Sequence, residues 1–556
     1  MRAIDKYSCK QENLTLNPAE KLPIIGRFFK KKPRSEARVY RGIESVRRRA
    51  KPLFYVIRAF FRMVIRTQHR EIQALGLENI PPDGSVLLVG NHPNSFLDYF
   101  NLLNVVRHPV GTAAKDTITN WFLLGPILRD HMLMVPISRK MDHADTSELS
   151  EEARRASNAD SLREAVELLV KGRLLNIFVE GRSTDSRKLN KLKLGFMYIA
   201  IQAEKEFNFD LNLRIVPYGF YYSRINKFQS DVCVIFGRPI KLKDLTTIPE
   251  DFLALSEGDR TAIEKKIMVA GKQRISDAIE DIIISIDEKH LIDLIDDATA
   301  LFTLTPMKYM GAYGNIREKY RLSKILADSF LAANRDESGQ ERLAHLKKMM
   351  SQYRKEVKSL GLRDAIIRRE HTLAEMGYHL RVFLTGVLYS PLIVYGFVFN
   401  YLPRVAGRLM RYFVIEVQKR PRVDGDEQAM IAATITALIT YPALGVLVYF
   451  GVKHYALAPL ADFLRMVFVH GEVFAPADWI TAGWTYISGT MGAVAVYLMA
   501  RLWRFSLYHG QRLKDAIYWM GDFTIEVFRG PFVRQLRNHR SEIIDTIDFI
   551  IGDYDH

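Results

Sequence analysis

Three stretches without a single charged residue lie in the last third of the chain, at residues 382–402, 429–452 and 479–500. They contain 21, 24 and 22 residues. Helices of that length, rising about 1.5 Å per residue, span the roughly 30 Å of a bilayer's hydrocarbon. One charge at the centre of such a helix would cost roughly 2.5–3.5 kcal/mol. The absence of charges therefore favours membrane helices over the buried helices of a soluble protein, and we expect a membrane region at residues 381–500.

Basic residues on both sides of the first stretch indicate how this region is oriented. Arginines precede and follow residues 382–402, whereas the loop 453–478 carries no positive excess. Cytoplasmic loops are enriched in Lys and Arg. If all three stretches crossed the membrane, either the basic loop 403–428 or the catalytic domain would lie outside the cytoplasm. We therefore predict a re-entrant hairpin at 382–402, bent near Pro391 where a helical hydrogen bond is lost. Two spans would follow, at 429–452 and 479–500.

The N-terminal part carries much of the chain's net charge of +16. Residues 27–51 hold eleven lysines and arginines against two glutamates, and residues 1–50 are predicted to form a basic arm. Across residues 51–70 arginines recur every four positions, at Arg58, Arg62 and Arg66, among bulky apolar side chains. On a helix this spacing gives a cationic stripe beside apolar surface, which suits anionic lipid headgroups. A helix packed on the core with solvated arginines is the simpler alternative.

Other sequence features restrict the partners and the compartment. The positive charge would also suit nucleic acid, but the chain contains no helix-turn-helix, zinc or single-strand-binding pattern, so no nucleic-acid partner is expected. The two cysteines, Cys9 and Cys233, lack metal-ligand spacing and are expected to be free thiols in a reducing compartment. The first twenty residues contain no apolar core of a secretory signal. We expect the catalytic part to face the cytoplasm and to hold no metal.

The segment 71–248 has the pattern of an α/β domain. Short apolar runs typical of strands alternate with helical stretches at 161–171 and 193–205. This alternation predicts a mixed sheet flanked by helices on both faces. Residues 249–380 read as almost continuous helix and are predicted to connect this domain to the membrane region, and residues 501–556 are predicted to be a basic C-terminal tail. The predicted strands lie at residues 86–89, 174–179, 213–216 and 232–236.

The first of these strands leads into the segment Asn91-His92-Pro93-Asn94-Ser95-Phe96-Leu97-Asp98. Five residues separate His92 from Asp98, and on one continuous helix the two side chains would point about 240° apart. Pro93 indicates that His92 precedes the helix, which leaves Asp98 in an early turn from which it can reach back. A neutral imidazole can take a proton from an alcohol, and a carboxylate on its other nitrogen fixes the tautomer.

Residues suited to bind a phosphorylated substrate follow the other predicted strands. Gly181 permits close backbone approach, and Arg182 and Ser183 supply a cation and a hydroxyl. Arg139 follows a short strand, and Lys193 lies at the start of the next helix, where anions are favoured. Each cation alone would usually be a solvated surface charge, but together they suit a phosphorylated substrate beside a base.

These motifs resemble the glycerol-3-phosphate/1-acylglycerol-3-phosphate acyltransferase superfamily over residues 70–245. They occur in order as His92…Asp98, Pro136–Arg139, Phe178-Val179-Glu180-Gly181 and Ile215-Val216-Pro217. The resemblance implies that His92 is the base and that Asp98 orients it. It also implies acyl-CoA or acyl carrier protein as the donor, with no metal or prosthetic group. The residues that it implies for the glycerol phosphate site are Arg139, Glu180, Gly181 and Arg182, with Pro217 shaping the acyl-donor pocket.

Two departures from the common family pattern narrow the resemblance. The family usually has four residues between His and Asp, where this chain has five, and it usually has proline where this chain has Val179. The longer spacing and the run from Ile215 to Tyr222 resemble the fungal-type glycerol-3-phosphate/dihydroxyacetone-phosphate branch, whose members carry helical and membrane segments after the catalytic domain. This resemblance implies acylation at the first position of the glycerol backbone.

Two other functions remain open from the sequence alone. The acceptor could be 1-acylglycerol 3-phosphate or another lysophospholipid, because the motifs do not separate these acceptors from glycerol 3-phosphate. The chain could also be a catalytically silent lipid-binding or scaffold protein with the same fold, although intact His92, Asp98, Glu180 and Gly181 argue against that reading.

Overall fold

The structure is a computed structural model of the whole chain. It describes residues 50–115, 119, 125–137, 151–181, 183, 187–225, 228–303, 315–362, 364–367, 373–420, 422–451, 454 and 477–554. The chain divides into two compact units, residues 1–365 with 534–556 and residues 366–533, and each is described by itself. The predicted basic arm at 1–50 lies, apart from residue 50, outside the described residues.

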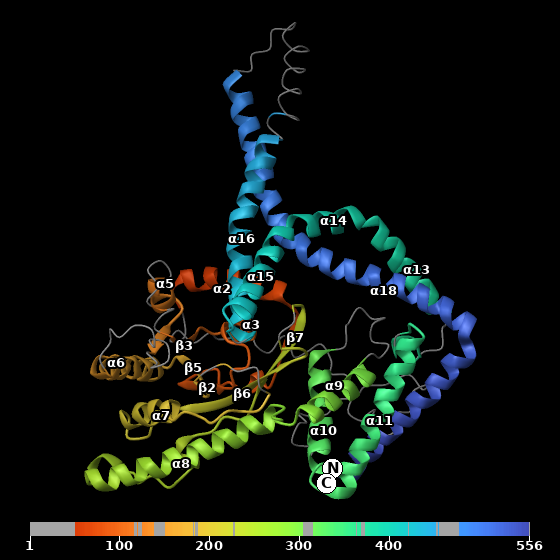
Figure 1. The fold of residues 1–556 in the computed structure, drawn as a ribbon. Helices are drawn as coiled ribbons and strands as arrows, with labels where there is room; N and C mark the ends of the chain where they lie inside the picture. Colours follow the sequence, from red (N-terminus) through yellow and green to blue (C-terminus); the bar gives the residue numbers. More distant parts are fainter. Residues whose placement is uncertain are drawn as a thin grey trace. The chain divides into compact units, whose positions relative to one another are not determined.

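The first unit is built on a seven-stranded mixed sheet, which confirms the predicted α/β class (Figure 1). The strand order is β1-β7-β6-β2-β5-β3-β4. Strands β4, β3, β5, β2 and β6 run parallel, whereas β7 is antiparallel to β6 and parallel to its other neighbour, β1. The strands are β1 (His69–Leu75), β2 (Val86–Gly90), β3 (Val110–Lys115), β4 (Met134–Ile137), β5 (Leu174–Phe178), β6 (Arg214–Tyr222) and β7 (Ser230–Phe236).

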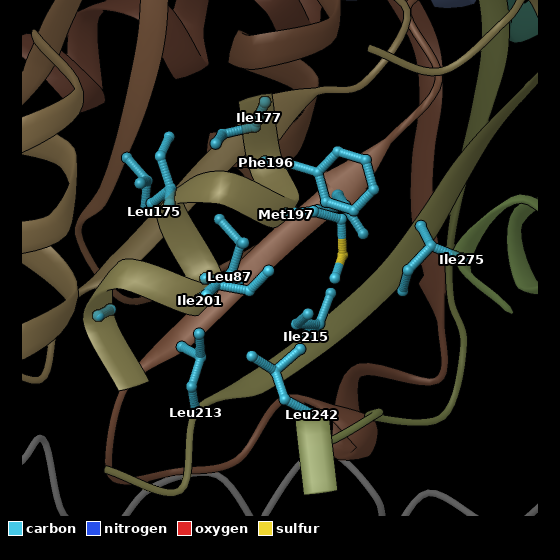
Figure 2. Packing of buried hydrophobic residues seen from close by; sticks show 14 of the residues in the cluster. Leu87, Leu175, Ile177, Phe196, Met197, Ile201, Leu213, Ile215, Leu242 and Ile275 are labelled. Carbon is cyan, nitrogen blue, oxygen red and sulfur yellow. The ribbon is translucent and has the colours of Figure 1, made fainter. Parts of the chain in front are cut away.

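A large apolar core covers one face of this sheet. Helices α6 (Glu151–Val170), α7 (Gly195–Lys205) and α8 (Glu257–Ile282) supply its outer layer. Because side chains alternate between the faces of a strand, Leu87 of β2 shares this side with residues of β5 and β6. Figure 2 shows these side chains packed with Phe196, Met197 and Ile201 of α7. Burying one such side chain completely contributes about 1.5–3 kcal/mol to the free energy of folding.

Helices α2 (Pro52–Gln68) and α3 (Phe96–Val105) cover the opposite face (Figure 1). The rings of Phe61 and Phe100 stack with centroids 3.8 Å apart. The predicted cationic stripe on α2 was wrong at Arg58, whose side chain is buried. Its guanidinium donates to the carbonyl oxygens of Leu103 (3.1 Å), Val106 (2.5 Å) and Arg107. Arg58 therefore caps the C-terminal end of α3, where unpaired carbonyls attract a cation.

A helical region follows the sheet, as predicted, with α8, α9 (Lys289–Thr303), α10 (Ile316–Ala333), α11 (Glu337–Ser359) and α12 (Asp364–Ile367). The end of the long helix α18 (Ala477–Tyr554) belongs to the same unit. Arg540 donates to Asp364 (3.0 Å) and to the carbonyl oxygen of Leu301 (2.6 Å). The segment predicted as a C-terminal tail is thus helical, and its last turns are tied to the helical region.

The second unit consists of helices. They are α13 (Leu373–Leu388), α14 (Ser390–Phe399), α15 (Tyr401–Tyr412), the π-helix Phe413–Val417, α16 (Arg422–Gly451) and the first part of α18. Among the described residues, Gln428–Gly451 is the one helical stretch long and apolar enough to cross a membrane unaided. Helices Met376–Leu388 and Ser390–Val398 are long and apolar enough only when they are taken together, and the chain bends by 58° between them. The bend lies where Pro391 was expected to break the segment 382–402. The predicted span 479–500 lies within α18, and its side chains are outside the described residues.

Candidate active site at the carboxyl ends of strands β2 and β5

The site lies where two neighbouring parallel strands end. Strands β2 and β5 pair in parallel, with Gly90 opposite Phe178. His92 follows β2 by two residues and Glu180 follows β5 by two residues. The carboxyl ends of parallel strands lie at one edge of a sheet, which is where α/β proteins commonly place ligands. The sheet thus brings together two motifs that are far apart in the sequence.

His92 and Asp98 form the pair that the sequence predicted. Helix α3 begins at Phe96, so His92 precedes it and Asp98 lies in its first turn. The distance between Nδ1 of His92 and Oδ2 of Asp98 is 2.9 Å. A carboxylate accepts only, so the imidazole proton sits on Nδ1 and the lone pair on Nε2. The ring stacks on Phe178 with centroids 3.9 Å apart, and the side chain is 14% exposed. Nε2 is therefore the ring nitrogen that can accept a proton.

Asp98 is fully buried and is held by three donors. Besides His92, the backbone N–H of Asn94 donates to Oδ2 (2.7 Å) and the hydroxyl of Tyr222 donates to Oδ1. Asp98 also lies in the first turn of α3, near the positive end of the helix dipole. Burial and the nearby Asp98 raise the pKa of Tyr222 well above its usual value, so its hydroxyl keeps its proton.

Glu180 is buried behind His92, and both of its oxygens are engaged within the protein. Oε1 accepts the backbone N–H of His92 (2.8 Å), and Oε2 accepts the backbone N–H of Asn190 (3.2 Å) and its side-chain amide. The sequence led us to expect Glu180 among the residues that line the phosphate site. In the structure its carboxylate holds the backbone of the His92 loop.

The predicted residues Gly181, Ser183 and Lys193 lie beside this loop. Gly181 has a φ of +70°, a conformation that glycine adopts without strain. A Cβ at this position would lie 3.2 Å from Cγ of Lys193, so the lysine stem passes close to it. The hydroxyl of Ser183 accepts the backbone N–H of Ser95 (2.8 Å). These three residues therefore lie near His92, at the carboxyl ends of β2 and β5.

Of the other predicted residues, Pro217 is described and is not brought to the site. Pro217 lies within β6 opposite Val89, and its neighbour Tyr218 points to the face that carries Phe178. Because adjacent strand residues point to opposite faces, the side chain of Pro217 faces away from His92. Its role at the acyl-donor pocket stays a prediction. Arg139 and Arg182 lie outside the described residues.

The sequence interpretation missed several residues of the site. Ser95 has a φ of +45°, which is strained for a residue with a side chain and is typical of functional turns. Tyr222 donates to Asp98 from a segment 124 residues away, and Asn190 donates to Glu180 from ten residues further along the chain. In the sequence, Tyr222 ends the run from Ile215 that resembles the fungal-type branch. Its period-two spacing with Tyr218 and Phe220 places these residues on one face of a strand.

No group of three or more His, Cys, Asp or Glu side chains that could hold a metal ion occurs among the described residues. The expectation that the chain needs no metal or prosthetic group stays a prediction. The free thiol of Cys233 is buried in β7, and burial raises its pKa to about 12, so it is not a nucleophile at neutral pH.

Comparison with known proteins supports the family resemblance in part. Residues 71–221 match the family model "Acyltransferase". No curated protein matches the chain significantly. A solved structure with detectable similarity is the 1-acyl-sn-glycerophosphate (LPA) acyltransferase PlsC from Thermotoga maritima. It has 18% sequence identity, the alignment covers 40% of this chain and 80% of that chain, and the TM-score is 0.25. The match of residues 71–221 covers His92, Asp98 and Glu180, and it supports an acyltransferase domain; the fungal-type branch stays a prediction.

Proposed function

We propose that this protein is a membrane-bound acyltransferase of glycerolipid synthesis. It would move a fatty acyl group from acyl-CoA or acyl carrier protein to the sn-1 hydroxyl of glycerol 3-phosphate or dihydroxyacetone phosphate. The observation that carries this proposal is the His92–Asp98 pair, 2.9 Å apart, inside the segment that matches the acyltransferase family model. The long spacing between His92 and Asp98, which resembles the fungal-type branch, favours the first acylation step.

In the proposed reaction His92 acts as the general base. Nε2 takes the proton of the acceptor hydroxyl as its oxygen attacks the thioester carbonyl. The new C–O bond forms, the C–S bond breaks, and the imidazolium returns the proton to the leaving thiolate. Asp98 stabilises the imidazolium between these steps. Because Asp98 is fully buried, this charge pair is weakly screened by solvent.

We propose that the phosphate of the acceptor binds next to the His92 loop, between Gly181 and the start of α7. Lys193 lies beside Gly181, and helix α7 begins two residues later at Gly195. A lysine ammonium and the N-terminal N–H groups of a helix both favour a phosphate. We propose that Arg139, Arg182 and Ser183 complete this site, as the resemblance implies, and that Glu180 is a positioning residue. A phosphate held there would fix the glycerol backbone relative to Nε2.

The choice of acceptor is tested with purified protein in mixed micelles. Glycerol 3-phosphate, dihydroxyacetone phosphate and 1-acylglycerol 3-phosphate are each offered with radiolabelled acyl-CoA. We expect kcat/KM for one of the first two acceptors to exceed that for the lysolipid by at least tenfold. Preference for the lysolipid would replace the first acylation step with the second. Absence of transfer to every acceptor, with both donors tried, would contradict the proposed function itself.

Membrane association is supported by exposed apolar helix faces. On α2, Val56 and Met63 are 65% and 45% exposed, on the side opposite buried Phe54 and Ile65.

Helix α15 likewise has a buried side and an exposed side. Pro403 and Gly407 are buried, and Gly407 packs closely against Ala429 and Ala433 of α16. The outer side carries an arginine row, Arg404, Arg408 and Arg411, next to exposed Tyr401, Leu402, Leu409 and Tyr412. Such a division suits anionic headgroups above an apolar layer.

The proposed topology is tested by cysteine labelling in intact cells. In a Cys9→Ser background, Lys419→Cys is expected to stay unlabelled by an impermeant maleimide until the membrane is permeabilised. The matched variant Asp462→Cys, in the loop between the two proposed spans, is expected to react from outside. Labelling of Lys419→Cys in intact cells would contradict the re-entrant segment and the cytoplasmic location of the arginine row.

A further inference from the structure

A chain of buried hydrogen bonds continues behind Asp98 into the sheet. The hydroxyl of Tyr222, in β6, donates to Oδ1 of Asp98. Asn101, in α3, places its side-chain nitrogen 3.0 Å from the Tyr222 hydroxyl and 3.3 Å from Nε2 of His69. Nδ1 of His69, in β1, lies 3.2 Å from the hydroxyl of Ser230, in β7. All of these side chains are buried, and they come from four different elements.

One arrangement of protons fits the contacts of this chain, with Oδ1 of Asn101 left buried and without a partner among the described residues. The carboxylate of Asp98 can only accept, so the single hydroxyl proton of Tyr222 points to it. The oxygen of Tyr222 must then accept from the amide nitrogen of Asn101. The same amide nitrogen donates to Nε2 of His69, which puts the ring proton on Nδ1, toward Ser230. Burial lowers the pKa of His69 to about 4, so the ring stays neutral and can accept at Nε2.

The hydrogen bond from Tyr222 affects how Asp98 holds His92. Oδ2 of Asp98 faces His92, whereas Oδ1 is bonded by Tyr222. Without that donor, Oδ1 would be a buried carboxylate oxygen with no partner among the described residues, and the negative charge would be less stabilised. The carboxylate would then either rotate away from His92 or attract the Nδ1 proton more strongly.

We propose that Tyr222, oriented by Asn101 and His69, is a positioning residue that fixes the Asp98 carboxylate against His92. This inference rests on the proposed function, in which His92 is the base. The His–Asp spacing does not point to Tyr222, Asn101 or His69, and the run from Ile215 to Tyr222 that carries the family resemblance gives Tyr222 no role. Among the described residues, the titratable and charged groups near the His92–Asp98 pair and its loop are Glu180 and Lys193, which follow β5, and Tyr218 and Tyr222 from β6.

The test compares two neighbouring tyrosines of β6. Tyr222→Phe removes the donor to Asp98. Tyr221→Phe removes an equally buried hydroxyl, bonded to Ser323 at 2.8 Å on the opposite side of the strand. For Tyr222→Phe we expect kcat to fall by about 10- to 100-fold, as for loss of a hydrogen bond to a charged group. We expect KM to change less than twofold and the acid limb of the kcat profile to move to higher pH. Tyr221→Phe should keep the kcat and the pH profile of the wild type.

A second readout does not depend on substrate. The rate at which diethylpyrocarbonate modifies His92, followed by mass spectrometry across pH, should rise at a higher pH in Tyr222→Phe than in the wild type or in Tyr221→Phe. Identical kcat, pH profile and modification rates in the two tyrosine variants would overturn the inference. If the wild type transfers no acyl group, the proposed function fails, and the modification profile of His92 still decides whether Tyr222 positions the pair.

Discussion

Replacing His92 with alanine is expected to lower kcat for acyl transfer by about 10²- to 10⁴-fold, the range supplied by a general base. In the proposed reaction Nε2 of His92 takes the proton of the acceptor hydroxyl, and alanine supplies no such group. The fold should persist, because the imidazole lies at the edge of the sheet and Glu180 holds the backbone of residue 92 rather than its side chain. The measurement is the initial rate of radiolabelled acyl transfer, with thermal unfolding followed in parallel.

His290→Ala is the control for this variant, because His290 is exposed in α9. We expect it to retain full activity and stability. Unchanged turnover in His92→Ala would remove the base assignment. It would also revive the reading of this chain as a lipid-binding protein without catalysis, which the sequence left open.

Replacing Asp98 with asparagine should lower kcat by up to about 10⁴-fold, the loss seen when the same change is made in a Ser-His-Asp triad. The amide has the shape of the carboxylate but carries two protons. It would present an N–H to Nδ1 of His92 or to the donors Asn94 and Tyr222, which already point at this position. If the amide donates to Nδ1, the imidazole proton moves to Nε2, and the base loses its lone pair.

The control for Asp98→Asn is Asp364, a carboxylate outside the site that is 15% exposed and has similar partners. Asp364 accepts from the hydroxyl of Tyr353 (2.5 Å) and from Arg540 (3.0 Å) in the helical region. Asp364→Asn is expected to reduce the thermal stability to a comparable extent while leaving kcat within twofold of the wild type. If Asp98→Asn retains more than a tenth of the wild-type kcat, Asp98 does not set the tautomer of His92.

The contact between His92 and Asp98 could be predicted because both residues belong to one strand–turn–helix segment. Pro93 and the apolar residues from Phe96 onward indicate where the helix begins, and the length of the turn then decides whether a side chain in the first turn can reach back. The alternation of strands and helices likewise predicted the α/β class, since each element shows its own hydrophobic period.

The role of Arg58 shows that the spacing of residues along a helix does not predict what each side of the helix contacts. Arginines at every fourth position predict that the side chains share one side of a helix, and they do not tell whether that side faces solvent or another element. The carbonyl groups at the end of α3 decide this question, and they lie 45 to 49 residues further along the chain. The stripe on α2 is therefore shorter than the sequence alone predicted.

The sequence by itself determined the local features of the site: a histidine at a strand end and a carboxylate within its reach, in a chain with a charge-free stretch, 429–452, that forms a helix over Gln428–Gly451. Only the tertiary structure decided which groups hold that pair in place. Glu180 is 88 residues from His92, and Tyr222 is 124 residues from Asp98. Their hydrogen bonds form because the sheet places β2 between β5 and β6. Strand order depends on packing among segments distant in the chain, and no local pattern of residues specifies it.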